Sequence, residues 1–303
     1  MKSIERIVVG VDLGADAIGP TAMLAITEAR IIAEASGAQI TLLHSTRADE
    51  RWDDGTKSYT SVPESREADA RAIIERGIAA LRSAGLECEI VVTEAPPGLA
   101  IVQHVLRIGG DLAIVGRRTD VDHDDRRMGS VSLNVVRHCP CLVYVVSPAS
   151  QPRPRVIVAA TDGGPVGREV VTSAAMLAAL CGSVLHAIHT IQLGMEVQME
   201  GEEAEREFVE RRRQEIRAAI EAQAAEAGFQ GELHVHAGVT TPTRGVLDAL
   251  KRLRPDLVAM GTISRGGIPG LLVGNTAERL LGTIDCSLLV AKPVDFVCPV
   301  KVD

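Results

Sequence analysis

The chain carries the same landmarks twice in the same order, and this internal repeat constrains the fold more than any other feature. Each half has one apolar stretch that ends in aspartate, one that ends in histidine and one that ends in glycine. These landmarks are Asp12 and Asp162, His44 and His189, and Gly116 and Gly261. The histidines and the glycines are each 145 positions apart, whereas the aspartates are 150 apart. Two copies of one fold in tandem are therefore expected, with a longer connection between aspartate and histidine in the first copy.

Short stretches rich in Val, Ile and Leu alternate with longer amphipathic helix patterns in each half. This alternation predicts βαβ units and a parallel sheet covered on both faces. Three prolines in SPASQPRPR, residues 147–155, interrupt every regular pattern and mark the boundary. The sequence therefore predicts an α/β protein with two tandem doubly wound domains, over residues 1–149 and 150–303, each with a five-stranded parallel sheet.

Composition excludes several classes of function. The formal charge of −8 argues against binding to DNA or RNA, and an aromatic content of 2% leaves few side chains for stacking bases. No stretch approaches the roughly 20 apolar residues of a membrane span, so we expect a cytoplasmic protein. The six cysteines are dispersed and have no CxxC spacing, which predicts reduced core thiols.

A glycine-rich loop follows the last landmark of each half. Gly116 is followed by a loop that ends in Gly129 and Ser130 at the start of a helix pattern. Gly261 is followed by a similar loop, with Gly274, Asn275 and Thr276 in that place. Ligands of doubly wound sheets collect at the carboxyl ends of the strands, and helix N-termini attract phosphate. The layout therefore predicts an anion site, although Asn275 or Thr276 as a simple helix cap remains an alternative.

In these loops the sequence resembles the universal stress protein family, in its tandem-domain form and with a Rossmann-type, HUP-like fold. Nucleotide-binding members carry G-x2-G-x9-G-(S/T) after the fourth strand and an aspartate after the first. The second glycine is replaced by Thr119 in one half and by Ser264 in the other, and Asn275 replaces the final hydroxyl residue. GNTAERLL and DCSLLVAKP are most similar to the bacterial E-type tandem members.

The resemblance implies ATP, another adenine nucleotide or another phosphate-bearing ligand, with Mg²⁺ only alongside a nucleotide. We expect the ligand in the second half, where Arg265 offers a cation and the loop has no acid. The residues implied there are Asp162, Gly261, Ser264, Arg265, Gly274, Asn275 and Thr276. Those implied in the first half are Asp12, Gly116, Gly129 and Ser130, but four aspartates in DVDHDD oppose a phosphate unless Mg²⁺ or arginines such as Arg117 compensate. Each strand-end aspartate has a cap of the following turn as its alternative role.

Histidines suggest a different chemistry. His234 and His236 lie two positions apart, so they share one face of a strand, and the strand with His186 and His189 is expected beside it. Imidazoles from neighbouring strands can bind zinc. Because no carboxylate or cysteine completes the set, packed histidines are the favoured interpretation and zinc is unlikely.

No P-loop, nucleophile elbow or HExxH motif is present in the sequence. We therefore expect a non-catalytic binding or sensor module of the stress response. A nucleotide-hydrolysing switch with weak ATPase activity and a ligand-free interaction module remain as alternatives. The edge strands with LVYVV and LLVAK are expected to pair, so that the chain forms an internal pseudo-dimer, and a higher oligomer stays open.

Overall fold

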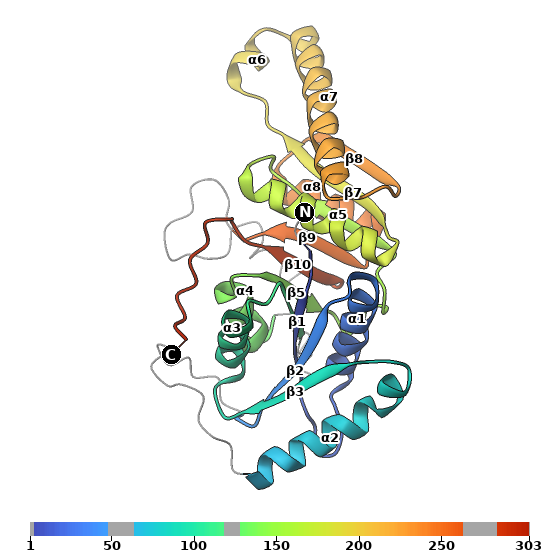
Figure 1. Cartoon of the computed structure of the whole chain (residues 1–303). Coiled ribbons are helices and arrows are strands. Elements are labelled where there is room, and N and C mark those ends of the chain that lie inside the picture. The colour runs from blue at the N-terminus through green and yellow to red at the C-terminus, as the bar shows by residue number, and fades with distance from the viewer. Residues whose placement is uncertain (1–2, 48–63, 118–127, 263–283, 303) are drawn as a thin grey trace. The chain divides into compact units, whose positions relative to one another are not determined.

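The computed structural model describes residues 3–47, 64–117, 128–262 and 284–302. Contacts divide the chain into an N-terminal unit, residues 2–153, 284–290 and 295–303, and a C-terminal unit, residues 154–283 and 291–294. In both units strands alternate with helices (Figure 1), as the sequence predicts. Among the described helices, none combines the length and the apolar character of a membrane span.

The N-terminal unit contains a parallel sheet with the order β3-β2-β1-β4-β5. Its elements are β1 (Arg6–Gly10), α1 (Pro20–Ser36), β2 (Gln39–Ser45), α2 (Glu64–Ser83), β3 (Cys88–Thr93), α3 (Pro97–Ile108), β4 (Leu112–Gly116), α4 (Ser130–His138) and β5 (Leu142–Val146). Part of β10 (Ser287–Ala291) belongs to this unit and pairs antiparallel with β5. In that pairing Tyr144 lies opposite Leu289, its counterpart 145 residues later.

The C-terminal unit repeats the same winding, with the parallel order β8-β7-β6-β9. Its elements are β6 (Val156–Ala160), α5 (Pro165–Cys181), β7 (Val184–Ile191), α6 (Met195–Met199), α7 (Glu202–Glu226), β8 (Leu233–Val239), α8 (Pro242–Leu253) and β9 (Leu257–Gly261). The amide of Thr262 donates to the carbonyl of Ala291, the last residue of β10. The predicted doubly wound α/β fold in two copies is confirmed.

The sequence explains where these elements form. The central strands are apolar along their length because helices cover both faces, so Ile7, Val8 and Val9 of β1 are fully buried. Helices α1 and α5 begin with a proline, whose fixed φ suits the first turn. They end at Gly37 and Gly182, with φ of 77° and 69°, a left-handed conformation that glycine adopts without strain.

The longer connection in the first copy lies between β1 and α1. A small turn occupies this place: Leu13 bridges Ile18, and the amide of Gly14 donates to the carbonyl of Ala17 over 2.8 Å. Ile18 is buried against α2, where a Cβ on Gly77 would come within 2.6 Å of the Ile18 Cδ1. The extra residues therefore anchor α2, and the C-terminal unit lacks this turn because α5 starts soon after Asp162.

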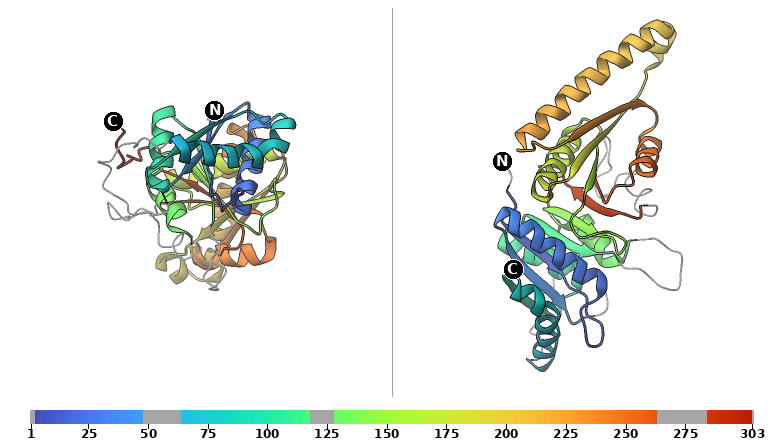
Figure 2. Two further views of the ribbon diagram at one scale, coloured as in Figure 1. Left: turned by 90° about the horizontal axis from the view of Figure 1, so that it is seen from below. Right: turned by 90° about the vertical axis from the view of Figure 1, so that its right-hand side faces the viewer.

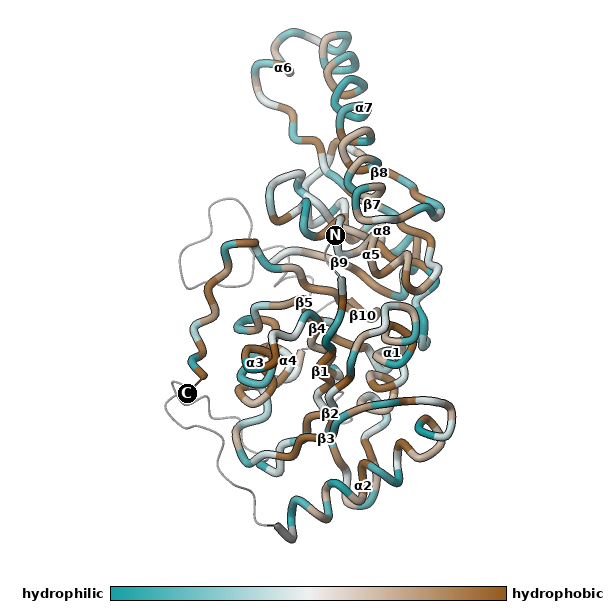
Figure 3. The backbone as a smooth tube through the Cα atoms, viewed as in Figure 1, coloured by the Kyte–Doolittle hydropathy of each residue, from teal (hydrophilic) through white to brown (hydrophobic). Residues whose placement is uncertain are grey.

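Helix α7 is rich in hydrophilic residues and extends beyond the sheet (Figures 2 and 3). The sequence predicts one long surface helix in residues 196–228, but Gly201, at a φ of 100°, separates the short α6 from α7. A single stripe of α7 is buried, formed by Val209, Ile216, Ile220 and Ala224. The cysteine side chains are thiols, and those of Cys139 and Cys181 are buried.

Candidate functional site

The carboxyl end of β4 brings three of the predicted ligand residues together in the N-terminal unit. The Ser132 hydroxyl donates to the carbonyl of Gly116 over 2.8 Å, which holds the start of α4, with Gly129 and Ser130, beside the strand end. A Cβ on Gly116 would lie 2.9 Å from the Thr21 side chain, so only glycine allows α1 to pack this closely. The cap at Gly129 has no side-chain hydrogen bond. Thr119 and the four aspartates lie outside the described residues.

Asp12 and His44 meet at the neighbouring strand ends. The Nδ1 of His44 lies 2.9 Å from the carbonyl of Val11, which accepts the bond, so this nitrogen carries the proton. Burial lowers the pKa of His44, while the bond to Val11 and the nearby Asp12 oppose that shift. The His44 ring therefore holds the chain just before the exposed Asp12.

Arg117, which follows Gly116, bonds to a distant segment of its own unit. Its side chain is buried, and its guanidinium donates to the carbonyls of Ile284 and Cys286. Both carbonyls belong to the segment 284–290 of the same unit. Peptide carbonyls thus accept from two of its three nitrogens, and the role of Arg117 as a counter-charge stays a prediction because the aspartates lie outside the described residues.

In the C-terminal unit, Asp162 occupies the end of β6 and caps the turn that leads into α5. Its Oδ1 accepts a hydrogen bond of 2.9 Å from the amide of Gly164. A Cβ on Gly163 would lie 3.2 Å from the Cε1 of His189, so this turn also contacts the end of β7. The capping alternative for the strand-end aspartate is thus realised in this copy.

Gly261 and Thr262 lie at the end of β9. A Cβ on Gly261 would come within 2.3 Å of the Val166 Cγ1, the same helix contact that Gly116 makes with Thr21. Thr262, the counterpart of Arg117, is 1% exposed, and its hydroxyl has no hydrogen-bond partner among the described residues. The other ligand residues predicted here lie outside the described part of the chain: Ser264, Arg265, Gly274, Asn275 and Thr276.

The predicted neighbourhood of histidines on β7 and β8 is confirmed. His186 lies opposite His234, and its ring stacks on those of His234 and His236 with centroids 4.7 and 5.3 Å apart. Arg252 donates to the Nδ1 of His236 over 3.3 Å, so the Nε2 of His236 carries the proton and donates to the Nδ1 of His186 over 3.0 Å. Both ring nitrogens of His236 are therefore occupied.

Two observations bear on zinc at this cluster. Within the described ranges, no group of three or more His, Cys, Asp or Glu side chains is arranged to hold a metal ion. Burial, with the charge of Arg252 and the neighbouring rings, lowers the pKa of His236, and burial likewise lowers the pKa of His186. His186 and His236 thus form a hydrogen-bonded pair of rings, whereas His234 stacks on His186 and bonds to Glu232 over 2.7 Å.

A cavity of about 430 Å³ is the feature that sequence reasoning missed. It lies at the carboxyl ends of β7 and β8 and is flanked by α7 and α8. Arg213, Arg217 and Arg252 line it, together with His236 and Asp248. A position-by-position comparison of the two halves would have revealed it, because small residues replace larger ones at several of its walls.

Together, the fold and the strand-end glycines define a duplicated, doubly wound α/β protein. The universal stress protein family model matches residues 3–147 and 154–292. The chain belongs to this family.

Similar proteins agree with this assignment. Universal stress protein E of Escherichia coli K12 is 37% identical over 70 residues, which cover 23% of this chain and 22% of that protein. The match thus spans about a fifth of the relative's length. A protein of unknown function from Pseudomonas aeruginosa PAO1, PA1789, superposes with a TM-score of 0.66 at 23% identity, over 96% of this chain and 94% of that one. A universal stress protein from Archaeoglobus fulgidus gives a TM-score of 0.67 at 17% identity, over 95% and 98%.

Proposed function

We propose that this universal stress protein is a non-catalytic binding module that takes an adenine nucleotide, or another phosphate-bearing ligand, at the strand ends of its C-terminal unit. The residues assigned to the ligand are Asp162, Gly261, Ser264, Arg265, Gly274, Asn275 and Thr276. Mg²⁺ would enter with a nucleotide. The family loop motif, with its glycine-rich approach to a helix start, supplies the chemistry for a phosphate group.

We place the ligand in the C-terminal unit because Arg117 and Thr262 differ in their hydrogen bonds. These residues follow the equivalent glycines of β4 and β9. Arg117 donates to two peptide carbonyls of its own unit, and its Nε has no hydrogen-bond partner among the described residues. The Thr262 hydroxyl is buried without a partner among the described residues, and a buried hydroxyl without a bond costs roughly 1–3 kcal/mol. A ligand oxygen beside Gly261 would satisfy it.

The proposal includes an internal pseudo-dimer, since one strand from each copy pairs in the N-terminal unit. Tyr144 of β5 faces its own counterpart, Leu289 of β10. Self-complementary pairing of equivalent residues is the arrangement of an isologous interface. Light scattering should therefore give the mass of one chain, and a dimer at low concentration would show that a further interface exists.

Titration calorimetry with ATP tests the site, with and without Mg²⁺. Thr262→Val removes the hydroxyl and keeps the shape, so it should weaken ATP binding while raising the free energy of unfolding by about 1 kcal/mol in the absence of ligand. Ser132→Ala is the matched control at the β4 end of the other unit, and its ATP affinity should equal that of the parent.

The alternatives give different outcomes in the same experiment. A ligand-free interaction module would show no heat with ATP at all. A nucleotide-hydrolysing switch would show binding and then release phosphate over time. If the Gly274→Val variant binds ATP as tightly as the parent, the assignment of this loop to the ligand is refuted.

A further inference from the structure

The cavity beside β7 and β8 is lined by residues other than the described ones of the proposed strand-end site. Asp162, Gly261 and Thr262 do not line it, and its walls come from β7, β8, α7 and α8 (Figure 1). A volume of about 430 Å³ lies within the range of small-molecule sites, roughly 300–1,000 Å³. The cavity therefore has room for a ligand of its own.

Small side chains create this space. Gly238 and Ala249 stand where the N-terminal unit has Thr93 and His104, 145 positions earlier. Thr93 and His104 are 1% and 5% exposed, so they fill the equivalent volume. A Cβ built on Gly238 meets no atom within 4 Å. The framework of strands and helices is thus the same in both units, and the described residues of the C-terminal copy leave this space open.

The walls carry positive charge. Arg213 and Arg217 come from α7 and Arg252 from α8, whereas Asp248 is the one acid among the described lining residues. Asp248 lies 3.6 Å from Arg244, which partly balances it. In a chain with a formal charge of −8, this local excess of arginine favours an anionic ligand.

Two of the guanidinium groups are held in place by the protein. The Nε of Arg213 donates to the carbonyl of Ala237 over 3.2 Å, and Arg252 donates to the Nδ1 of His236 over 3.3 Å. Glu210 lies 3.7 Å from the Nη1 of Arg213, too far for a hydrogen bond. Because these groups are already oriented, they lose less freedom when they bind an anion.

We infer that this cavity binds a small phosphate ester that also carries hydroxyl groups, of the sugar phosphate class. The planar guanidinium groups match phosphate oxygens in pairs. Thr190, Thr240 and Asp248 line the same cavity and suit hydroxyl groups. Among its described lining residues there is no Phe, Tyr or Trp, and the aromatic rings that line it are the smaller imidazoles of His189 and His236.

Titration calorimetry of the full chain with glucose 6-phosphate tests this inference, with glucose as the comparison ligand that lacks the phosphate. Arg217→Gln removes an exposed charge from the cavity wall. Gly238→Thr introduces the residue of the N-terminal unit and fills the space. Arg212→Gln is the control, because Arg212 lies on the same helix but pairs with Glu215 at 2.5 Å and does not line the cavity.

The parent should bind glucose 6-phosphate and not glucose. Arg217→Gln and Gly238→Thr should each weaken binding by about tenfold or more, equivalent to ~1.4 kcal/mol, while Arg212→Gln leaves it unchanged. No binding by the parent at millimolar glucose 6-phosphate, or equal binding in both cavity variants, would overturn the inference. Arg217→Gln and Gly238→Thr should leave the affinity for ATP unchanged, whereas Thr262→Val should weaken it. This difference would show that the cavity and the proposed nucleotide site are separate.

Discussion

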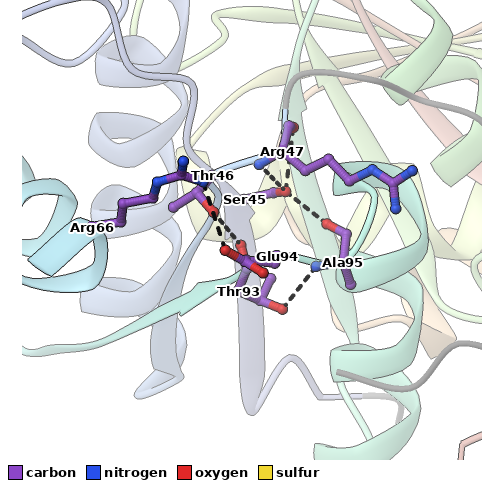
Figure 4. Close-up of polar contacts among 7 residues, drawn as sticks. All are labelled: Ser45, Thr46, Arg47, Arg66, Thr93, Glu94 and Ala95. Carbon is purple, nitrogen blue, oxygen red and sulfur yellow. Dashed lines mark hydrogen bonds and ion pairs between the residues drawn. The ribbon is translucent and has the colours of Figure 1, made fainter. Parts of the chain in front are cut away.

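The carboxyl ends of β2 and β3 are closed by polar contacts, whereas the equivalent ends of β7 and β8 enclose a cavity. In the closed copy the Ser45 hydroxyl donates to the carbonyl of Ala95 over 2.6 Å (Figure 4). The amide of Thr46 donates to the carbonyl of Thr93 over 2.9 Å, and the Thr93 hydroxyl accepts from the amide of Ala95 over 3.2 Å. These bonds tie the two strand ends and the start of α3 together.

The open copy lacks one of the side chains that make those ties, that of Thr93, whereas Thr190 stands in place of Ser45. Gly238 and Val239 replace Thr93 and Glu94, so both the hydroxyl and the carboxylate that faces Arg66 at 3.8 Å are missing. The strand register is the same in both units, since Ile40 pairs with Cys88 as Leu185 pairs with Leu233. A few side chains on a duplicated framework therefore decide whether this place is closed or can receive a ligand.

The largest effect is expected from Tyr144→Phe, which breaks a contact found in the N-terminal unit alone. Tyr144 donates a hydrogen bond to the buried carboxylate of Glu28, and the C-terminal unit has Leu289 and Ser173 at these positions. Removing the donor to a buried carboxylate should lower the free energy of unfolding by ~2–3 kcal/mol. Urea denaturation measures the loss.

The double variant Tyr144→Leu, Glu28→Ser is the control, because it copies the C-terminal pair and leaves no buried carboxyl group. It should be more stable than Tyr144→Phe. A Tyr144→Phe protein as stable as the parent would show that this hydrogen bond does not distinguish the units.

The next prediction concerns the stability of variants at Gly116 and Gly261, where a strand end lies close to a helix in each copy. Gly261→Ala should destabilise the chain by ~2–3 kcal/mol, because the new methyl group would lie 2.3 Å from Val166. Gly116→Ala should cost less, ~1 kcal/mol, since its nearest neighbour is 2.9 Å away on Thr21. Calorimetric melting of both variants gives the ranking, and the reverse order would contradict the packing described for the two helices.

The smallest effect is a change in pH dependence at His104, the residue that fills the closed copy. Burial lowers the pKa of His104 below its usual 6.5, with Glu89 and Arg107 as its charged neighbours. The unfolded chain therefore takes up this proton first, so His104 removes stability as the pH falls below about 6.5. His104→Leu should reduce the slope of stability between about pH 7 and 5, measured by urea denaturation at each pH.

His104→Leu should also be more stable than the parent by ~1 kcal/mol at pH 7. Both ring nitrogens of His104 lack a hydrogen-bond partner among the described residues, and leucine has no polar atom to satisfy. An unchanged pH slope would mean that His104 is solvated in the native state.

The fold could be predicted from the sequence because one offset repeats throughout. His44 and His189, or Gly116 and Gly261, fix the register of two copies, and the apolar strands and proline-initiated helices agree with it. The extra turn after Asp12 was predictable as a longer connection. The packing of this turn against Gly77 could not be predicted, because that contact joins residues far apart in the chain.

The site could be predicted only where the motif is local. Asp162 and Gly261 lie at the strand ends as expected, and so does Gly116. The use of Arg117 could not be foreseen, because its carbonyl partners belong to a segment more than 160 residues later. The cavity was missed for a similar reason: Arg217 and Arg252 come together through the packing of α7 and α8 on the same strands.

Counting bound ligands by native mass spectrometry tests the asymmetry between the two units most directly. The parent chain in glucose 6-phosphate should carry one molecule per chain, since the N-terminal copy of the cavity is filled by Thr93 and His104. Gly238→Thr should carry none. Two molecules per chain in the parent, or one that persists in Gly238→Thr, would contradict the distinction between a closed and an open copy.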